Sequence, residues 1–152
     1  MTEVGTEYFT IGVFKDVEWA ARGIAALQSK GFGPEALSVI VKATPEAAAL
    51  IEKTLGRSPE PREVAGLGPA LAAGALVATL DGGDLGLERR GLAATLGRAG
   101  FQAHDGHIYQ ALTSRGGVLV AVKSEARAAD ALAVLHAYGG GNAAIGAWLG
   151  RL

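Results

Sequence analysis

The sequence predicts an α+β fold, and three observations support this prediction. Three short runs are rich in β-branched and aromatic residues, as strands are: YFTIGVF at 8–14, LSVIVK at 37–42 and VLVAVK at 118–123. Stretches with apolar residues at helical spacing follow the first and the third run. The chain has 152 residues, of which 49% are hydrophobic and 19% charged, so it can bury the core of a single domain spanning 1–152.

The first third of the chain predicts a strand, a helix, a second strand and a short helix. After the first strand, Asp16 is the expected cap of a helix that ends at Gly31. The second strand, 37–42, is followed by Thr44, which is the expected cap of a helix ending near Gly56. The helical crossover between the two strands is long enough to make them parallel.

The middle of the chain begins with RSPEPRE at 57–63, whose two prolines and alternating charges are typical of a surface connector. It leads into GLGPALAAGALVATL at 66–80, which has no charge and nothing larger than leucine. A membrane span would need about 20 apolar residues, and the stretch at 66–80 is shorter than that. A G-x-G-x-x-G phosphate loop would need a glycine where Leu71 stands.

The same stretch predicts a packed helix instead. Small residues four positions apart, among them Gly74, allow another backbone to approach closely. The following sequence, LGLERRGLAATLGRAG, supplies leucines for an opposing helix. We therefore expect antiparallel helices at 69–80 and 85–99, and an inserted glycine- and alanine-rich helical hairpin over 64–100.

The last part of the chain predicts a third strand and a long helix. Ser124 is the expected cap of this helix, and the glycines at 139–141 end it. Trp148 and its apolar neighbours fall at helical spacing, so we expect a short helix over 142–152, with an edge strand as the alternative. The element order is that of a ferredoxin-like sandwich (β-α-β, inserted helical hairpin, β-α) with a short C-terminal helix.

Three stretches resemble the bacterial heat-induced or general stress protein family. They are IGVFKDVEWAARGIAALQSKGFGPEALSVIV at 11–41, GLGPALAAGALVATL at 66–80 and GHIYQALTSRGGVLVAVKSEARAADALAVLHAYG at 106–139. Together they cover over half of the chain in the family's order. The resemblance implies a small domain with a glycine-rich central hairpin and no established biochemical role, and it supplies no catalytic residues. Members usually carry a longer hairpin, which counts against a membrane role here.

The segment HDGHIYQ at 104–110 is the best polar constellation in the sequence. His104 and His107 stand three positions apart and are weak candidates for metal ligands. The alternative, which we favour, is that Asp105 caps a helix and both histidines lie in solvent. We expect no metal and no cofactor. Since the chain has no cysteine and no motif of a catalytic triad, we also expect no catalytic residues.

Alternate residues of a strand face opposite sides of a sheet, and both sides of this sheet read as apolar. We assign Phe9, Ile11 and Val13 to the side under the crossover helices. An uncharged second side would have to be covered, by a second copy of the chain, by the hairpin or by the terminal helix. We expect a two-fold dimer, and the expected interface residues are Tyr8, Thr10, Phe14, Ile40, Leu119 and Trp148.

These features favour a non-enzymatic, stress-associated protein that acts through self-association or by docking on another macromolecule. One alternative is a small-molecule binding or sensing module that uses the cleft between sheet and hairpin. A second is a membrane-surface protein, which the short hairpin disfavours. The 14 basic and 15 acidic residues form no long block, so nucleic acid is not expected as a partner. Acidic residues stand where a signal peptide would be basic, which predicts a cytoplasmic location.

Overall fold

The computed structural model describes residues 8–74, 76–77, 87–98, 103–123, 128–137 and 147–151. Helices and strands are mixed along this part of the chain, as the predicted α+β class requires. The elements are β1 (Tyr8–Phe14), α1 (Val17–Ser29), the 3₁₀ turn η1 (Pro34–Ala36), β2 (Leu37–Lys42), α2 (Pro45–Leu55), β3 (Glu60–Val64), β4 (Gly68–Ala73), α4 (Leu87–Arg90), α5 (Leu92–Arg98), α6 (Ala103–Ser114), β5 (Val118–Lys123), α7 (Ala128–Ala137) and β6 (Ala147–Arg151).

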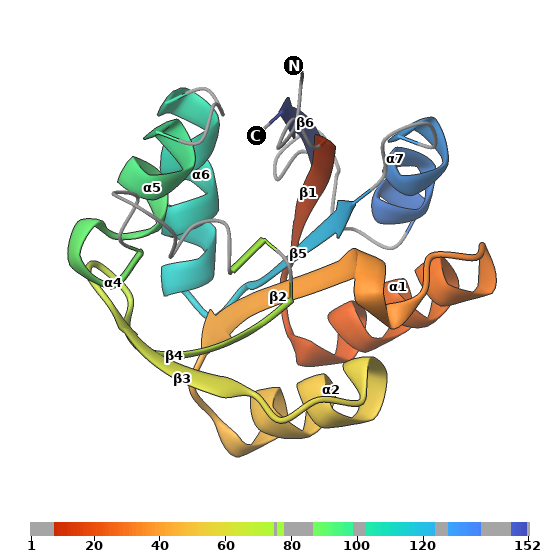
Figure 1. Cartoon of the computed structure of the whole chain (residues 1–152), viewed down its shortest axis with the longest axis horizontal. Helices are drawn as coiled ribbons and strands as arrows, with labels where there is room; N and C mark the ends of the chain where they lie inside the picture. Colours follow the sequence, from red (N-terminus) through yellow and green to blue (C-terminus); the bar gives the residue numbers. More distant parts are fainter. Residues whose placement is uncertain are drawn as a thin grey trace.

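The strands form one antiparallel sheet in the order β3-β4-β2-β5-β1-β6 (Figure 1). Because β1 and β2 both run antiparallel to β5, they are parallel to each other, as their crossover predicted. Strand β5 lies between them, so the two halves of the chain meet in the middle of the sheet.

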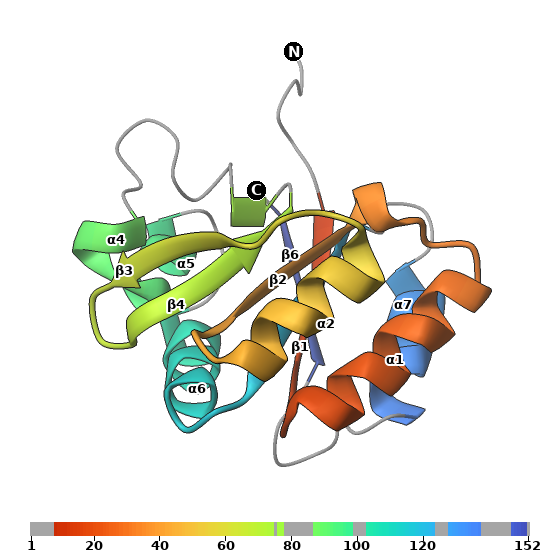
Figure 2. The same cartoon turned by 90° about the horizontal axis from the view of Figure 1, so that it is seen from below.

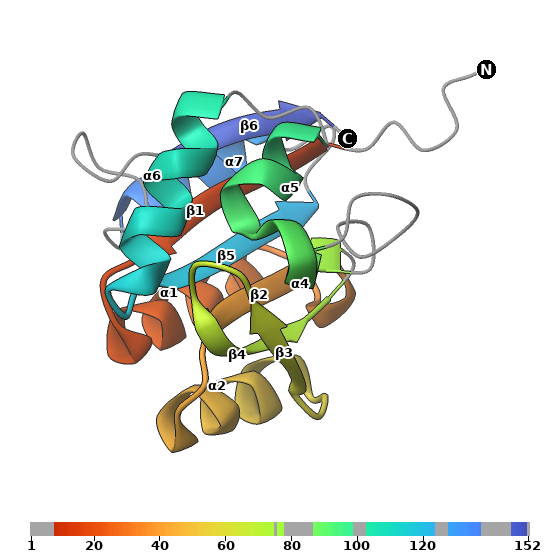
Figure 3. The same ribbon diagram turned by 90° about the vertical axis from the view of Figure 1, so that its left-hand side faces the viewer.

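Helices cover both faces of this sheet. Helices α1, α2 and α7 lie on the first face (Figure 2), and α5 and α6 lie on the second face (Figure 3). Each face has its own cluster of buried apolar side chains: Leu37, Val39, Val118 and Val120 belong to the first cluster, and Ile40, Leu119 and Ala121 belong to the second. Since β2 and β5 are buried on both faces, both strands read as mainly apolar runs, in which the polar residues are Ser38 and the terminal lysines.

The first two helices begin and end as predicted. The Oδ1 atom of Asp16 accepts a hydrogen bond of 2.9 Å from the Trp19 amide at the start of α1. The Thr44 hydroxyl oxygen accepts one of 3.0 Å from the Ala47 amide at the start of α2. Both caps satisfy amides that have no partner inside a helix. The predicted cap of the last helix, Ser124, lies outside the described residues.

The prediction of a connector was wrong at 60–63, and the prediction of a helix was wrong at 69–73, whereas residues 76–77 are helical. Residues Glu60–Val64 are the edge strand β3, and Gly68–Ala73 form β4, which pairs with β2 and β3. The small residues of β4 alternate between the faces, because Ala70 and Ala72 belong to the second cluster and Ala73 belongs to the first. A strand that is covered on both sides shows no alternation of polarity, and its sequence can therefore be mistaken for a packed helix.

The second arm of the predicted hairpin is helical but packs elsewhere. Residues Leu87–Arg90 and Leu92–Arg98 form α4 and α5, which are separated at Gly91. Helix α5 packs against α6 (Figure 3). Among the described residues of 64–100, the strand β4 and the helices α4 and α5 thus take the place of the predicted antiparallel helical hairpin. Helix α6 begins at Ala103, so Asp105 lies within the helix and is not its cap.

The predicted helix over 142–152 was also wrong at the described residues 147–151. Residues Ala147–Arg151 form β6, which pairs antiparallel with β1 along all five positions, for example Trp148 with Ile11 and Gly150 with Phe9. The edge strand, which was the alternative, is therefore correct. Pairing with β6 provides hydrogen-bond partners along the side of β1 that faces away from β5.

Candidate functional site

The predicted interface divides between the two faces of the sheet. Phe14 pairs with Val118 and Thr10 with Val122, which places both on the first face. Both are fully buried by the chain itself. A side chain added at Gly23 of α1 would overlap the Phe14 ring, so helix and strand are in close contact. The predicted alternation of β1 was therefore out of phase: Ile11 and Val13 face the second side.

Ile40 and Leu119 do lie on the predicted second face, where they are also fully buried. They pack with Leu76 and with Tyr109 of α6. Residues that are buried within one chain cannot contact a second copy, so Thr10, Phe14, Ile40 and Leu119 are excluded from an interface. The side chains of Tyr8 and Trp148 lie outside the described residues.

The structure places His107 in α6 with its side chain exposed. The His104 side chain lies outside the described residues. Within the part of the chain that the structure describes, no group of three or more His, Cys, Asp or Glu side chains could hold a metal ion. No helix among the described residues is long and apolar enough to cross a membrane.

Three of the buried hydroxyl groups make hydrogen bonds to the backbone. The Ser38 Oγ accepts from the Leu76 amide at 3.0 Å, which ties the chain after β4 to β2. The hydroxyl of Thr95 in α5 donates to the carbonyl oxygen of Gly91, just before that helix, and the hydroxyl of Thr113 in α6 donates to the carbonyl oxygen of Tyr109. In addition, Gln110 Oε1 accepts from the Ala93 amide at 2.9 Å and so caps α5. These four polar groups hold the helices and strands of the second face in place.

Trp19 lies half-buried at the start of α1 and packs against the first cluster. The guanidinium carbon of Arg22 lies 5.0 Å from the centre of its ring, and Arg22 also forms an exposed ion pair with Glu18. This arrangement is a cation–π contact within one helix. The cation that contacts the Trp19 ring is therefore a residue of the same helix.

A groove runs between α1 and α7 on the first face. It is an open hollow of about 500 Å³, and its lining is Ala26, Ser29, Lys30, Asp130, Ala133, Val134 and Ala137. We call these residues the α1–α7 groove. Ala133 and Ala137 are one helical turn apart and both exposed, so apolar surface faces outward from α7. With side chains this small, another backbone can approach α7 closely.

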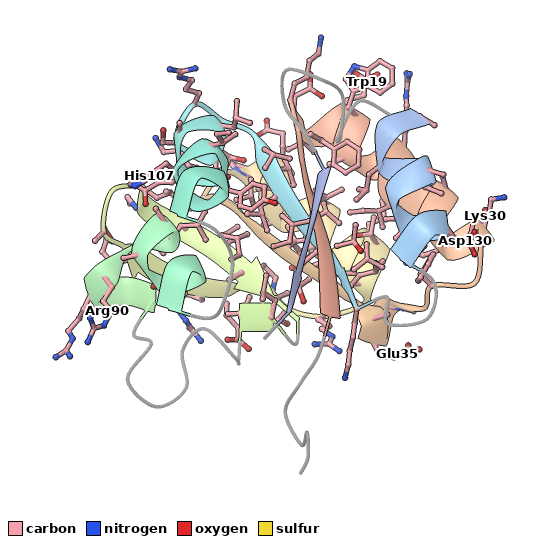
Figure 4. All side chains as sticks on the ribbon, turned by 90° about the horizontal axis from the view of Figure 1, so that it is seen from above. Trp19, Lys30, Glu35, Arg90, His107 and Asp130 are labelled. Carbon is pink, nitrogen blue, oxygen red and sulfur yellow. The ribbon has the colours of Figure 1, made fainter. Side chains whose placement is uncertain are left out.

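One end of the α1–α7 groove carries two opposite charges. Lys30 is the C-cap residue of α1, and Asp130 lies in the first turn of α7. Figure 4 shows the two side chains next to each other, on the side of the molecule opposite Arg90 and His107. Each charge stands at the helix end whose dipole stabilises it. The groove thus presents a positive and a negative group beside a row of small apolar side chains.

A second cavity of about 500 Å³ lies where the ends of α1 and α2 meet η1. Gln28, which lines it, donates a hydrogen bond of 2.7 Å to the carbonyl oxygen of Thr54. This bond connects the two helices. The exposed Lys53 also lines this cavity, so it too has a charged side chain at its rim.

Sequence reasoning missed the α1–α7 groove, although the sequence contains a signal for it. Helix α7 reads AADALAVLHA, which is apolar around most of its circumference. Once Leu135 is assigned to the core, Ala133 and Ala137 fall on another side of the helix. A helix that is apolar beyond its core stripe indicates a second contact.

The chain matches no protein-family model, no curated protein and no solved structure.

Proposed function

We propose that this chain is a non-enzymatic protein that acts by self-association, and that a second copy docks on the α1–α7 groove. The observation that supports this most directly is the charged end of the groove, because Lys30 and Asp130 are self-complementary. In a two-fold contact each residue meets its counterpart reciprocally. In addition to the interactions that each already makes, Lys30 would then lie near Asp130 of the partner subunit, and Asp130 near Lys30 of the partner subunit, beside the exposed Ala133.

The strand order supports a ferredoxin-like core as the scaffold of this surface. Strands β1, β2, β5 and β6, with α1 and α7 as crossover helices, follow the order β2-β5-β1-β6. We propose that β3, β4 and α4 to α6 are an insertion that widens the sheet and covers its second face. The resemblance to general stress proteins supports a stress-associated role in the cytoplasm.

The small-molecule alternative has less support at the place where it was expected. The space between the sheet and the helices of the second face contains Ile40, Leu76 and Tyr109, which are fully buried. The two cavities described above lie on the first face. A dimer that buries the α1–α7 groove accounts for the exposed alanines, whereas a ligand in the other cleft would not.

A charge exchange tests the proposed dimer. In Lys30→Glu, and separately in Asp130→Lys, like charges would meet across the two-fold axis. We expect each variant to form a dimer at least about tenfold weaker than the unchanged protein. Combining both changes in one chain restores the complementarity. Arg90→Glu, an equal change of charge at an exposed position of α4, is the control and should leave the dimer unchanged.

Mixing the two weak variants separates the contact between chains from effects within a chain. Lys30→Glu and Asp130→Lys are complementary to each other, so an equimolar mixture should form heterodimers in sedimentation or native mass spectrometry. The difference should shrink at high ionic strength, where exposed charges are screened. A mixture that associates no more strongly than either variant alone would overturn the proposed dimer.

A further inference from the structure

The two edges of the sheet differ in their protection against pairing. Strand β3 forms one edge, and it contains Pro61, which has no amide hydrogen. It also carries Glu60, Arg62 and Glu63, and Arg62 pairs with Glu60 at 2.8 Å. Prolines and charges of this kind keep an exposed edge from pairing with another chain.

Strand β6 forms the other edge and has no such protection. Its sequence, AWLGR, contains no proline and one charge, on Arg151 at its end. It pairs with β1 along one side, and no strand among the described residues pairs with its other side. In an antiparallel sheet, alternate residues direct their amide and carbonyl groups to opposite sides, so β6 directs backbone groups outward, where none of the described strands pairs with them.

We propose that β6 pairs antiparallel with β6 of a second copy, which would join the two sheets into one. The residues favour a register centred on Leu149. This register places Trp148 opposite Gly150 of the partner subunit, twice, and aromatic residues compensate for glycine in neighbouring strands. It also puts the two Arg151 residues at opposite ends of the pair, so that like charges are not directly opposed. The contact is two-fold and self-complementary, as closed dimers require.

This edge contact extends self-association to a second surface and does not depend on the α1–α7 groove. The groove lies on the first face of the sheet, whereas the edge contact uses the outer side of β6. A chain with both contacts can join two neighbours and form assemblies larger than a dimer. Loss of one contact should then leave dimers held by the other.

The experiment uses the full-length Ala133→Glu variant, in which the groove contact is blocked, so that only the edge contact is measured. Sedimentation should show dimers that dissociate on dilution. Hydrogen exchange of the amides at 147–151 should slow as the protein concentration rises. A variant that is monomeric at every concentration, with unchanged exchange, would overturn the edge contact but not the groove dimer. Protection that is independent of concentration would show that the chain covers its own edge, and would also overturn it.

The register is tested at its centre, where Leu149 faces Leu149 of the partner subunit. In the Ala133→Glu background, Leu149→Lys and Leu149→Glu should each be monomeric, since like charges would be opposed. Their equimolar mixture should form heterodimers. Glu63→Lys on the β3 edge is the control and should leave association unchanged. A mixture without heterodimers would overturn this register. The hydrogen-exchange measurement is made on the native β6 sequence, so it does not depend on how the Leu149 variants fold.

Discussion

Gly74 is the residue at which the chain turns from β4 toward the second face. Its φ of 110° lies in a region that other residues rarely adopt. A Cβ atom there would lie 2.5 Å from the carbonyl oxygen of Leu37 and from the Cα of Ser38, both in β2. These are backbone atoms of the sheet centre, which cannot easily move aside.

We predict that Gly74→Ala lowers the free energy of unfolding by about 2–4 kcal/mol, since backbone strain and overlap both contribute. Gly56→Ala is the matched control, because Gly56 also has a positive φ, of 65°, but a Cβ there would have nothing within 4 Å. Backbone strain alone should cost about 1 kcal/mol. Urea unfolding of both variants measures the difference. Equal losses would mean that the contact with β2 is not tight.

For single residues, the sequence predicts contacts between positions that are close together in the chain. The caps Asp16 and Thr44 were predicted correctly, because each bonds an amide three residues along the chain. The contact of Gly74 with Ser38 could not be predicted, since it depends on the pairing of β4 with β2. The phase of β1 was missed for the same reason: Thr10, Gly12 and Phe14 lie on the first face only because of their register with β5.

Among the elements, the edge strand β3 carries a prediction about aggregation. Pro61→Val would add an amide hydrogen and a β-branched side chain to an exposed edge strand. We expect the variant to aggregate several-fold faster on mild heating, because the added donor makes edge pairing easier. Light scattering over time measures this. Pro45→Val, a proline change in the first turn of α2, is the control and should not speed aggregation. Equal rates would show that Pro61 does not protect the edge.

The helices and strands that were predicted correctly are those whose apolar residues recur with a clear helical or strand period. Helices α1 and α2 and the strands β1, β2 and β5 fall where their patterns placed them. The missed strands lack such a pattern: β3 has prolines and charges because it is an edge, and β4 has no alternation because both of its faces are buried. In β6, the helical spacing of Trp148 and its neighbours was coincidental, and only pairing with β1 identifies the strand.

For the whole molecule, the decisive feature is that one chain covers both faces of its own sheet. The cluster under α1 and α7 and the cluster under α6 are separate, and the sheet lies between them. Association through the α1–α7 groove would therefore bury surface that is already compatible with water, and it would not complete an unfinished core. Obligate dimers, in contrast, often have no stable folded monomer.

We predict that the groove-blocked Ala133→Glu variant remains fully folded, with a free energy of unfolding within about 0.5 kcal/mol of the unchanged chain, since Ala133 is exposed. Ile40→Lys, which places a charge at a fully buried position of the second face, should abolish cooperative unfolding and not release a soluble monomer. Ile40→Val, the conservative control, should cost about 0.5–1.5 kcal/mol. Circular dichroism with thermal and urea unfolding distinguishes the three. If Ala133→Glu unfolded without cooperativity while Ile40→Lys stayed folded, the core would have to be shared between chains.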